Sequence, residues 1–153
     1  GGIAPVNEFL PTDGWGSSAM LGALIEGAAG IEDRYIGFQS VTLSPRWSAD
    51  PIHEIRDVYA IARYAAGNGY VAYQWRLTPV SNLQPARIEL TATGSGESFR
   101  LRLLLPSNTE PNIVILNGSP LSVQIEQIGF SRYLIINATG PIINVAATLK
   151  PRR

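Results

Sequence analysis

The feature that most constrains this chain is a series of short segments in which apolar and polar residues alternate. Alternation places successive side chains on opposite faces of a strand, so that one face can be buried while the other meets water. The longest such segments are 55–65 and 70–78, and Gly67-Asn68-Gly69 between them can supply the positive φ angles of a hairpin turn. The remaining alternating segments are 38–43, 86–93, 98–105, 113–116, 121–126, 133–138 and 142–149.

Turn residues separate these segments at intervals of roughly 8–12 residues, which is typical of an antiparallel sandwich. Asn117-Gly118 is the strongest short hairpin signal, and we expect it to pair segment 113–116 with segment 121–126. A chain of 153 residues can bury a core of its own. We therefore predict a mainly β fold, an antiparallel β-sandwich of about eight or nine strands with one N-terminal helix.

The predicted helix lies between Asp13, a good N-cap, and Gly30, a good C-terminal stop. Its residues are small or apolar nearly all round, with Ser17, Ser18 and Glu26 as exceptions. A surface helix on a small β domain should instead show one apolar stripe and one charged face. We therefore expect other elements to cover this helix, either a partner outside the 153 residues or the short N-terminal segment.

Composition excludes several classes of function. Lys and Arg total 12, as do Asp and Glu, and this balance favours neither nucleic acid nor an anionic membrane. No apolar run approaches the length of a membrane span. The absence of cysteine rules out disulfides and thiolate metal sites, and His53 is the only histidine, so no site with two His ligands can form. We expect neither a metal nor a cofactor.

Carboxylates offer little for catalysis, because Glu54 and Asp57 are placed on opposite faces of a predicted strand. Aromatic residues are better candidates, since a flat apolar ring with a polar tip suits a sugar. The candidate substrate-binding residues are Asp13, Trp15 and Trp47. The alternative is that Asp13 only caps the helix and the tryptophans only pack. Trp75 lies within an alternating strand, where core packing is the better interpretation.

Four stretches carry a resemblance to a known family. They are Gly-Trp-Gly-Ser-Ser-Ala at 14–19, Glu-Gly-Ala-Ala-Gly-Ile at 26–31, Gly-Phe-Gln-Ser-Val-Thr-Leu-Ser-Pro at 37–45 and Ile-Val-Ile-Leu-Asn-Gly-Ser-Pro-Leu at 113–121. In this order the elements resemble the C-terminal region of (α/α)6-toroid glycoside hydrolases, the α-L-rhamnosidase type above all. In that family a last toroid helix leads directly into a β-sandwich.

The resemblance implies that residues 1–33 are an N-terminal segment with a terminal toroid-type helix, and that 34–153 form the sandwich. It implies a fragment of a bacterial carbohydrate-active hydrolase, periplasmic or secreted rather than cytoplasmic. The role would be a non-catalytic accessory domain that braces the catalytic toroid, whose carboxylates lie upstream. On this interpretation the chain holds no catalytic residue.

Two alternatives stay open. In one, the chain is a self-contained carbohydrate-binding or adhesion-type sandwich, with Trp47 and Tyr35 as the binding platform and the helix docked on its own sheet. In the other, the helix joins a second subunit. The expected partners are therefore an upstream toroid domain or a second subunit through the helix, together with a carbohydrate ligand.

Overall fold

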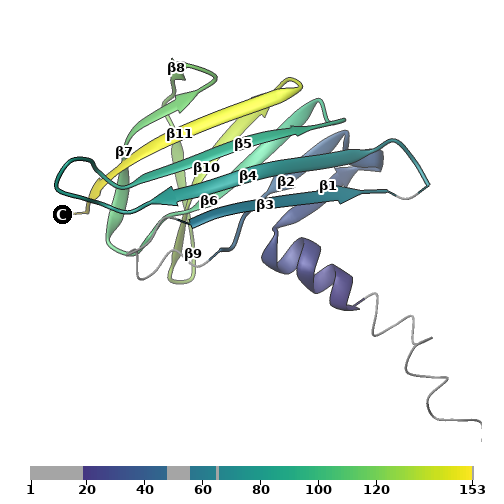
Figure 1. Cartoon of the computed structure of the whole chain (residues 1–153), viewed down its shortest axis with the longest axis horizontal. Coiled ribbons are helices and arrows are strands. Elements are labelled where there is room, and N and C mark those ends of the chain that lie inside the picture. The colour runs from purple at the N-terminus through teal and green to yellow at the C-terminus, as the bar shows by residue number, and fades with distance from the viewer. Residues whose placement is uncertain (1–18, 48–55, 65, 153) are drawn as a thin grey trace, which may run out of the picture.

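Alternation along each strand is what builds the core. In β4 (Tyr70–Thr78), Val71, Tyr73, Trp75 and Leu77 are buried, while the residues between them face outward or lie partly covered. The computed structural model describes residues 19–47, 56–64 and 66–152. In this part of the chain two sheets pack face to face, and a helix projects from one side of the sandwich (Figure 1).

One sheet has five strands in the order β1-β2-β6-β10-β9, and the other has six in the order β3-β4-β5-β11-β7-β8. The first sheet consists of β1 (Ile31–Tyr35), β2 (Ser40–Leu43), β6 (Ser98–Leu104), β10 (Ser131–Thr139) and β9 (Gln124–Ile128). The second consists of β3 (Arg56–Arg63), β4, β5 (Arg87–Gly94), β11 (Ile142–Pro151), β7 (Thr109–Leu116) and β8 (Ser119–Pro120). Within the described ranges all strand pairs are antiparallel except β2 with β6, so the predicted mainly β, antiparallel sandwich is confirmed.

The core lies between the two sheets, and both contribute to it. Trp75 is 2% exposed, which confirms its predicted place in the core. The other large side chains that are fully buried are Ile31, Leu43, Phe99, Leu101, Leu103, Leu134 and Ile136 from the five-stranded sheet, and Leu77, Ile88, Leu90 and Ile143 from the six-stranded sheet.

The described part of the chain contains eleven strands, and one of the two additional strands is β1. None of the predicted strand segments includes residues 31–35, but they pair antiparallel with β2. Ile31 is buried while the charged residues that follow lie at the edge of the sheet, where natural edge strands commonly carry charge. The sandwich therefore already includes residues 31–33. The division at residue 33 as a domain boundary stays a prediction.

The second additional strand is β8, which corrects the pairing expected around Asn117-Gly118. Both residues have positive φ, 48° and 84°, and Leu116 pairs with Ser119, so the hairpin turn itself is confirmed. The returning strand ends at Pro120, and one further backbone bond, from the N–H of Leu121 to the Val114 carbonyl at 2.9 Å, closes the pairing with β7. The next strand, β9, instead pairs with β10 in the other sheet.

Candidate functional site

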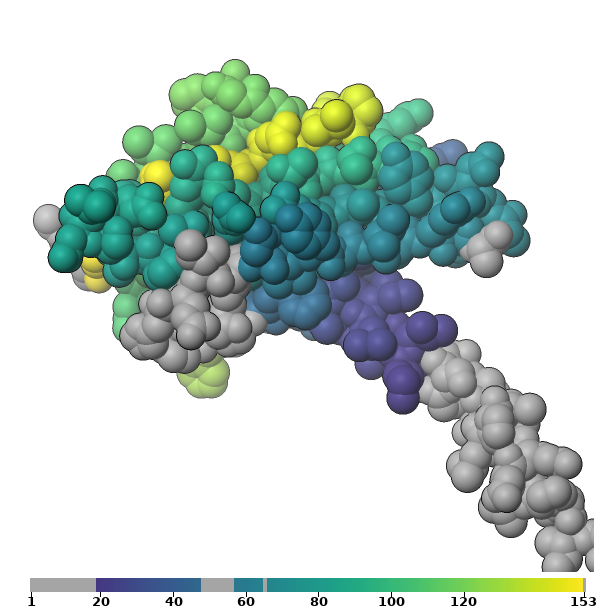
Figure 2. All heavy atoms as spheres, viewed as in Figure 1, coloured from purple at the N-terminus to yellow at the C-terminus, as the bar shows by residue number. Residues whose placement is uncertain are grey.

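The helix is described over residues 19–28, as an α-helical start that continues into the π-helix η1 (Ala23–Ala28). Met20, Leu21 and Leu24 are 57–67% exposed, and no residue of η1 is buried. Figure 2 shows this segment, in purple, protruding from the sandwich. The sandwich therefore leaves most of the apolar helix surface uncovered, in contrast to the alternative in which the helix docks on its own sheet. Among the described residues no helix is both long enough and apolar enough to cross a membrane.

The helix leaves the sandwich at Gly30, which has a φ of 64° as expected for a C-terminal stop. The N–H of Ser44 donates to the Gly30 carbonyl at 2.7 Å, and the N–H of Arg46 donates to the Ala28 carbonyl at 3.3 Å. These bonds fasten the C-terminal end of the helix to the chain that follows β2.

Trp47 and Tyr73 support the same junction from within the sandwich. The Tyr73 hydroxyl donates to the Ala29 carbonyl at 2.7 Å, and Nε1 of Trp47 donates to the Tyr73 oxygen at 3.1 Å. Burial raises the pKa of Tyr73 to about 12, although the hydrogen bond from Trp47 acts in the opposite direction. Trp47 is partly buried and packs against the core. Its indole N–H is thus already used to hold the helix end.

Of the three predicted binding residues, only Trp47 lies in the described part of the chain. Asp13 and Trp15 lie outside the described residues. A sugar-binding role for any of the three stays a prediction. Within the described ranges there is no group of three or more His, Cys, Asp or Glu side chains that could hold a metal ion.

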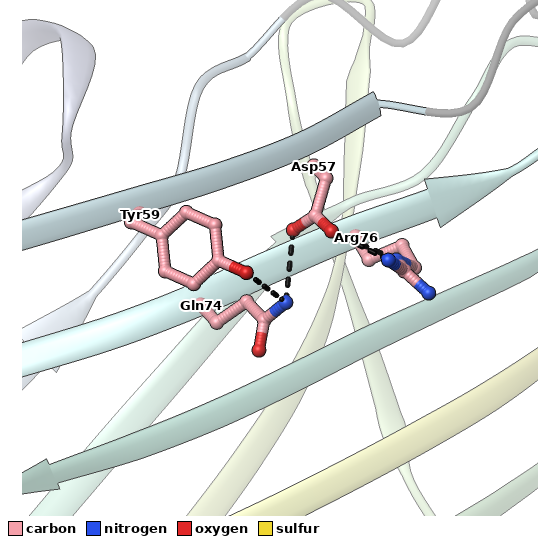
Figure 3. A network of polar contacts seen from close by, with 4 residues as sticks. All are labelled: Asp57, Tyr59, Gln74 and Arg76. Atoms are coloured by element: carbon pink, nitrogen blue, oxygen red, sulfur yellow. Dashed lines mark hydrogen bonds and ion pairs between the residues drawn. The ribbon is translucent and has the colours of Figure 1, made fainter.

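A polar network missed by the sequence analysis lies on the outward face of β3 and β4 (Figure 3). Nε2 of Gln74 donates to Oδ1 of Asp57 at 3.0 Å and to the Tyr59 hydroxyl at 2.9 Å. Arg76 donates to Oδ2 of Asp57 through Nε at 3.1 Å and Nη2 at 2.6 Å. The hydrogen bond from Gln74, and then that from Arg76, lowers the pKa of Asp57.

A hollow of about 330 Å³ lies beside this network. Its lining includes Tyr59, Ile61, Ala72, Gln74, Thr91 and Thr93, from three adjacent strands. Tyr59 and Ile61 are 72% and 70% exposed. A second hollow of about 160 Å³ lies beside Gln74, Arg76, Glu89 and Thr91.

The hairpin signal at 67–69 shows that β3 and β4 pair, but it does not give the register that forms the network. In the structure Tyr59 faces Gln74, Asp57 faces Arg76 and the last pair is Arg63 with Tyr70, so residues 64–69 connect the two strands. Gly67, Asn68 and Gly69 do not have the predicted positive φ angles, and a two-residue turn at 67–68 would instead have placed Tyr59 opposite Arg76. Directly opposed side chains on one face of a sheet are close enough to interact.

No family model matches the sequence, and no curated protein matches it. The fold is similar to that of a solved structure, the α-L-rhamnosidase from Dictyoglumus thermophilum, with a TM-score of 0.50 and 13% sequence identity. The similar region covers 78% of this chain and 12% of the rhamnosidase chain, so the chain corresponds to a small part of that enzyme. At this identity the likeness shows a shared fold, and function has to be argued from the surfaces.

Proposed function

We propose that this chain is a non-catalytic accessory β-sandwich of a bacterial glycoside hydrolase, and that its helix packs against the catalytic toroid of that enzyme. The exposed apolar helix carries the proposal. Helices of this length are marginal in water unless an apolar face packs on something else. Met20, Leu21 and Leu24 are largely uncovered by the sandwich, so another element has to supply the packing.

The likeness to one part of an α-L-rhamnosidase supports a glycoside hydrolase as the larger protein. In this arrangement the sandwich serves as a rigid base. The bonds from Ser44, Arg46 and Tyr73 hold the helix end at a fixed place, so the sandwich presents the helix to the toroid in one orientation. The catalytic carboxylates would then belong to the toroid.

Leu24→Asp tests this proposal, because the new charge should matter only where the helix is covered. In the enzyme that the intact source gene encodes, we expect a loss of about 2–5 kcal/mol in the free energy of unfolding. In the isolated 153-residue chain we expect a change within about 0.5 kcal/mol. Chemical denaturation followed by fluorescence measures both.

Leu83→Asp is the matched control, since Leu83 is an exposed leucine in the loop between β4 and β5. It should have little effect in either protein. An equal loss for Leu24→Asp in the enzyme and in the isolated chain would show that the helix belongs to the core of the sandwich, and would refute the proposal.

One observation favours the second candidate, a carbohydrate-binding sandwich. It is the hollow on the β3–β4–β5 face, which lies on strands and does not involve the predicted platform of Trp47 and Tyr35. An accessory sandwich can also carry such a site, so the two functions are compatible.

A further inference from the structure

We infer that the outward face of β3, β4 and β5 carries a binding site for a neutral carbohydrate, in the hollow beside Tyr59. This inference does not depend on what covers the helix. It uses the shape of the hollow, the free hydrogen-bonding groups beside it and the charges around it.

The strand register explains the shape of the hollow. Ile61, Ala72 and Thr93 face one another across β3, β4 and β5, and Tyr59, Gln74 and Thr91 form the adjacent row. Ala72 is the smallest side chain of the six and leaves room between its larger neighbours. A volume of about 330 Å³ is within the range of small-molecule sites, which is roughly 300–1,000 Å³.

Tyr59 and Ile61 provide an apolar wall that is open to solvent. The hydroxyls of Thr91 and Thr93 donate to Asn144 Oδ1 and to the Pro141 carbonyl, at 3.0 and 2.9 Å, so both hydroxyls already bond within the protein. The lining is therefore mostly apolar, although it lies beside a polar network. A sugar ring needs this combination, because it has an apolar C–H face and a rim of hydroxyls.

The network leaves one donor and one acceptor side by side for a ligand. The bonds to Asp57 and Tyr59 use both hydrogens of the Gln74 amide, and its oxygen points away from the network (Figure 3). The Tyr59 oxygen accepts from Gln74, so its own hydrogen can be donated elsewhere. Neighbouring sugar hydroxyls both donate and accept, and they match this pair.

Among the described residues, the lining of the hollow holds no ionised side chain, which favours a neutral ligand. Arg63, an exposed cation that follows Ile61 on the same face of β3, lies outside this lining. Asp57 pairs with Arg76 at 2.6 Å, and Glu89 pairs with Arg87 at 2.9 Å. The Asp57–Arg76 pair also holds the Gln74 amide in place before a ligand arrives. An anionic ligand in the hollow would therefore contact no cation of the described lining.

Affinity electrophoresis of the isolated chain tests the site, with soluble β-glucan, galactomannan or arabinoxylan in the gel as neutral probes and polygalacturonate as an acidic one. We expect retardation by at least one neutral polysaccharide. Tyr59→Ala and Gln74→Ala should each weaken it about tenfold or more, which corresponds to about 1.4 kcal/mol. Tyr59→Phe keeps the ring and loses the donor, so it should weaken binding less than Tyr59→Ala.

Tyr35→Ala is the control, because Tyr35 is an exposed tyrosine on the other sheet, and it should keep the affinity of the unchanged chain. Any of three results would overturn the inference. They are unchanged migration in every gel, retardation by polygalacturonate alone, and undiminished binding by both alanine variants. Sedimentation velocity tests whether this face instead binds a second copy of the chain. A self-association that Tyr59→Ala abolishes would assign this face to a second copy of the chain and would also overturn it.

Discussion

Replacing Gly30 by alanine is expected to lower the free energy of unfolding by about 3–5 kcal/mol. A Cβ atom added there would lie 1.8 Å from the Ser44 carbonyl oxygen and 2.3 Å from its carbon. Both are backbone atoms, and the N–H of Ser44 donates to Gly30 itself, so neither side can move freely. The φ of 64° adds the cost of a left-handed alanine.

Gly37→Ala is the matched control. Its φ is 72°, and an added Cβ would have no atom within 4 Å. This substitution should therefore lower the free energy of unfolding only by the cost of a left-handed alanine, about 1–2 kcal/mol. Urea denaturation of the two variants separates the steric cost from the conformational one. Equal losses of unfolding free energy in the two variants would mean that the backbone around Ser44 shifts to make room for the new Cβ. The helix would then not be held at a fixed place.

Alkaline pH is expected to destabilise the chain through Tyr73. The pKa of this group is about 12 in the folded state, whereas an unfolded tyrosine titrates near 10. Between these values the unfolded chain has released the proton and the folded chain keeps it, so stability falls as pH rises. The expected slope is about 1.4 kcal/mol per pH unit from pH 10 to 12. In Tyr73→Phe this contribution is absent.

Tyr73→Phe should also be less stable at neutral pH, by about 1–3 kcal/mol, because Trp47 Nε1 and the Ala29 carbonyl lose their partner. The gap between this variant and the unchanged chain should then narrow above pH 10. Trp47→Phe keeps the phenol and should retain the steep fall. If the free energies of unfolding of Tyr73→Phe and of the unchanged chain differ by the same amount at every pH from 9 to 12, the pH dependence does not come from Tyr73.

The β-sandwich could be predicted because alternation is a local property of the sequence. The hairpin between β3 and β4 shows this, since the observed bounds of β4 match the predicted segment 70–78. β1 was missed because one buried residue, Ile31, followed by charged residues has no visible alternation. The partner of β9 was missed because the Asn117-Gly118 turn says where the chain reverses, and not how far the returning strand continues.

The functional surfaces were harder to predict, for two different reasons. The helix could be seen to need a cover, but which elements cover it depends on packing between distant segments. The network of Asp57, Tyr59, Gln74 and Arg76 joins two strands, so predicting it needs the hairpin register, which the turn residues at 67–69 do not give. Trp47 looks like a free loop aromatic in the sequence because its bond to Tyr73 spans 26 residues.

Amide hydrogen exchange of the helix would test most directly whether another part of a larger enzyme covers it. Residues 19–28 would be followed in the protein that the intact source gene encodes and in the isolated chain, with β4 as the internal reference. We expect exchange in the helix to be slower in the intact protein, on the order of a hundredfold, and exchange in β4 to be alike in both. Equal exchange of the helix in the two samples, including the case in which the gene encodes only this chain, would contradict the proposed role.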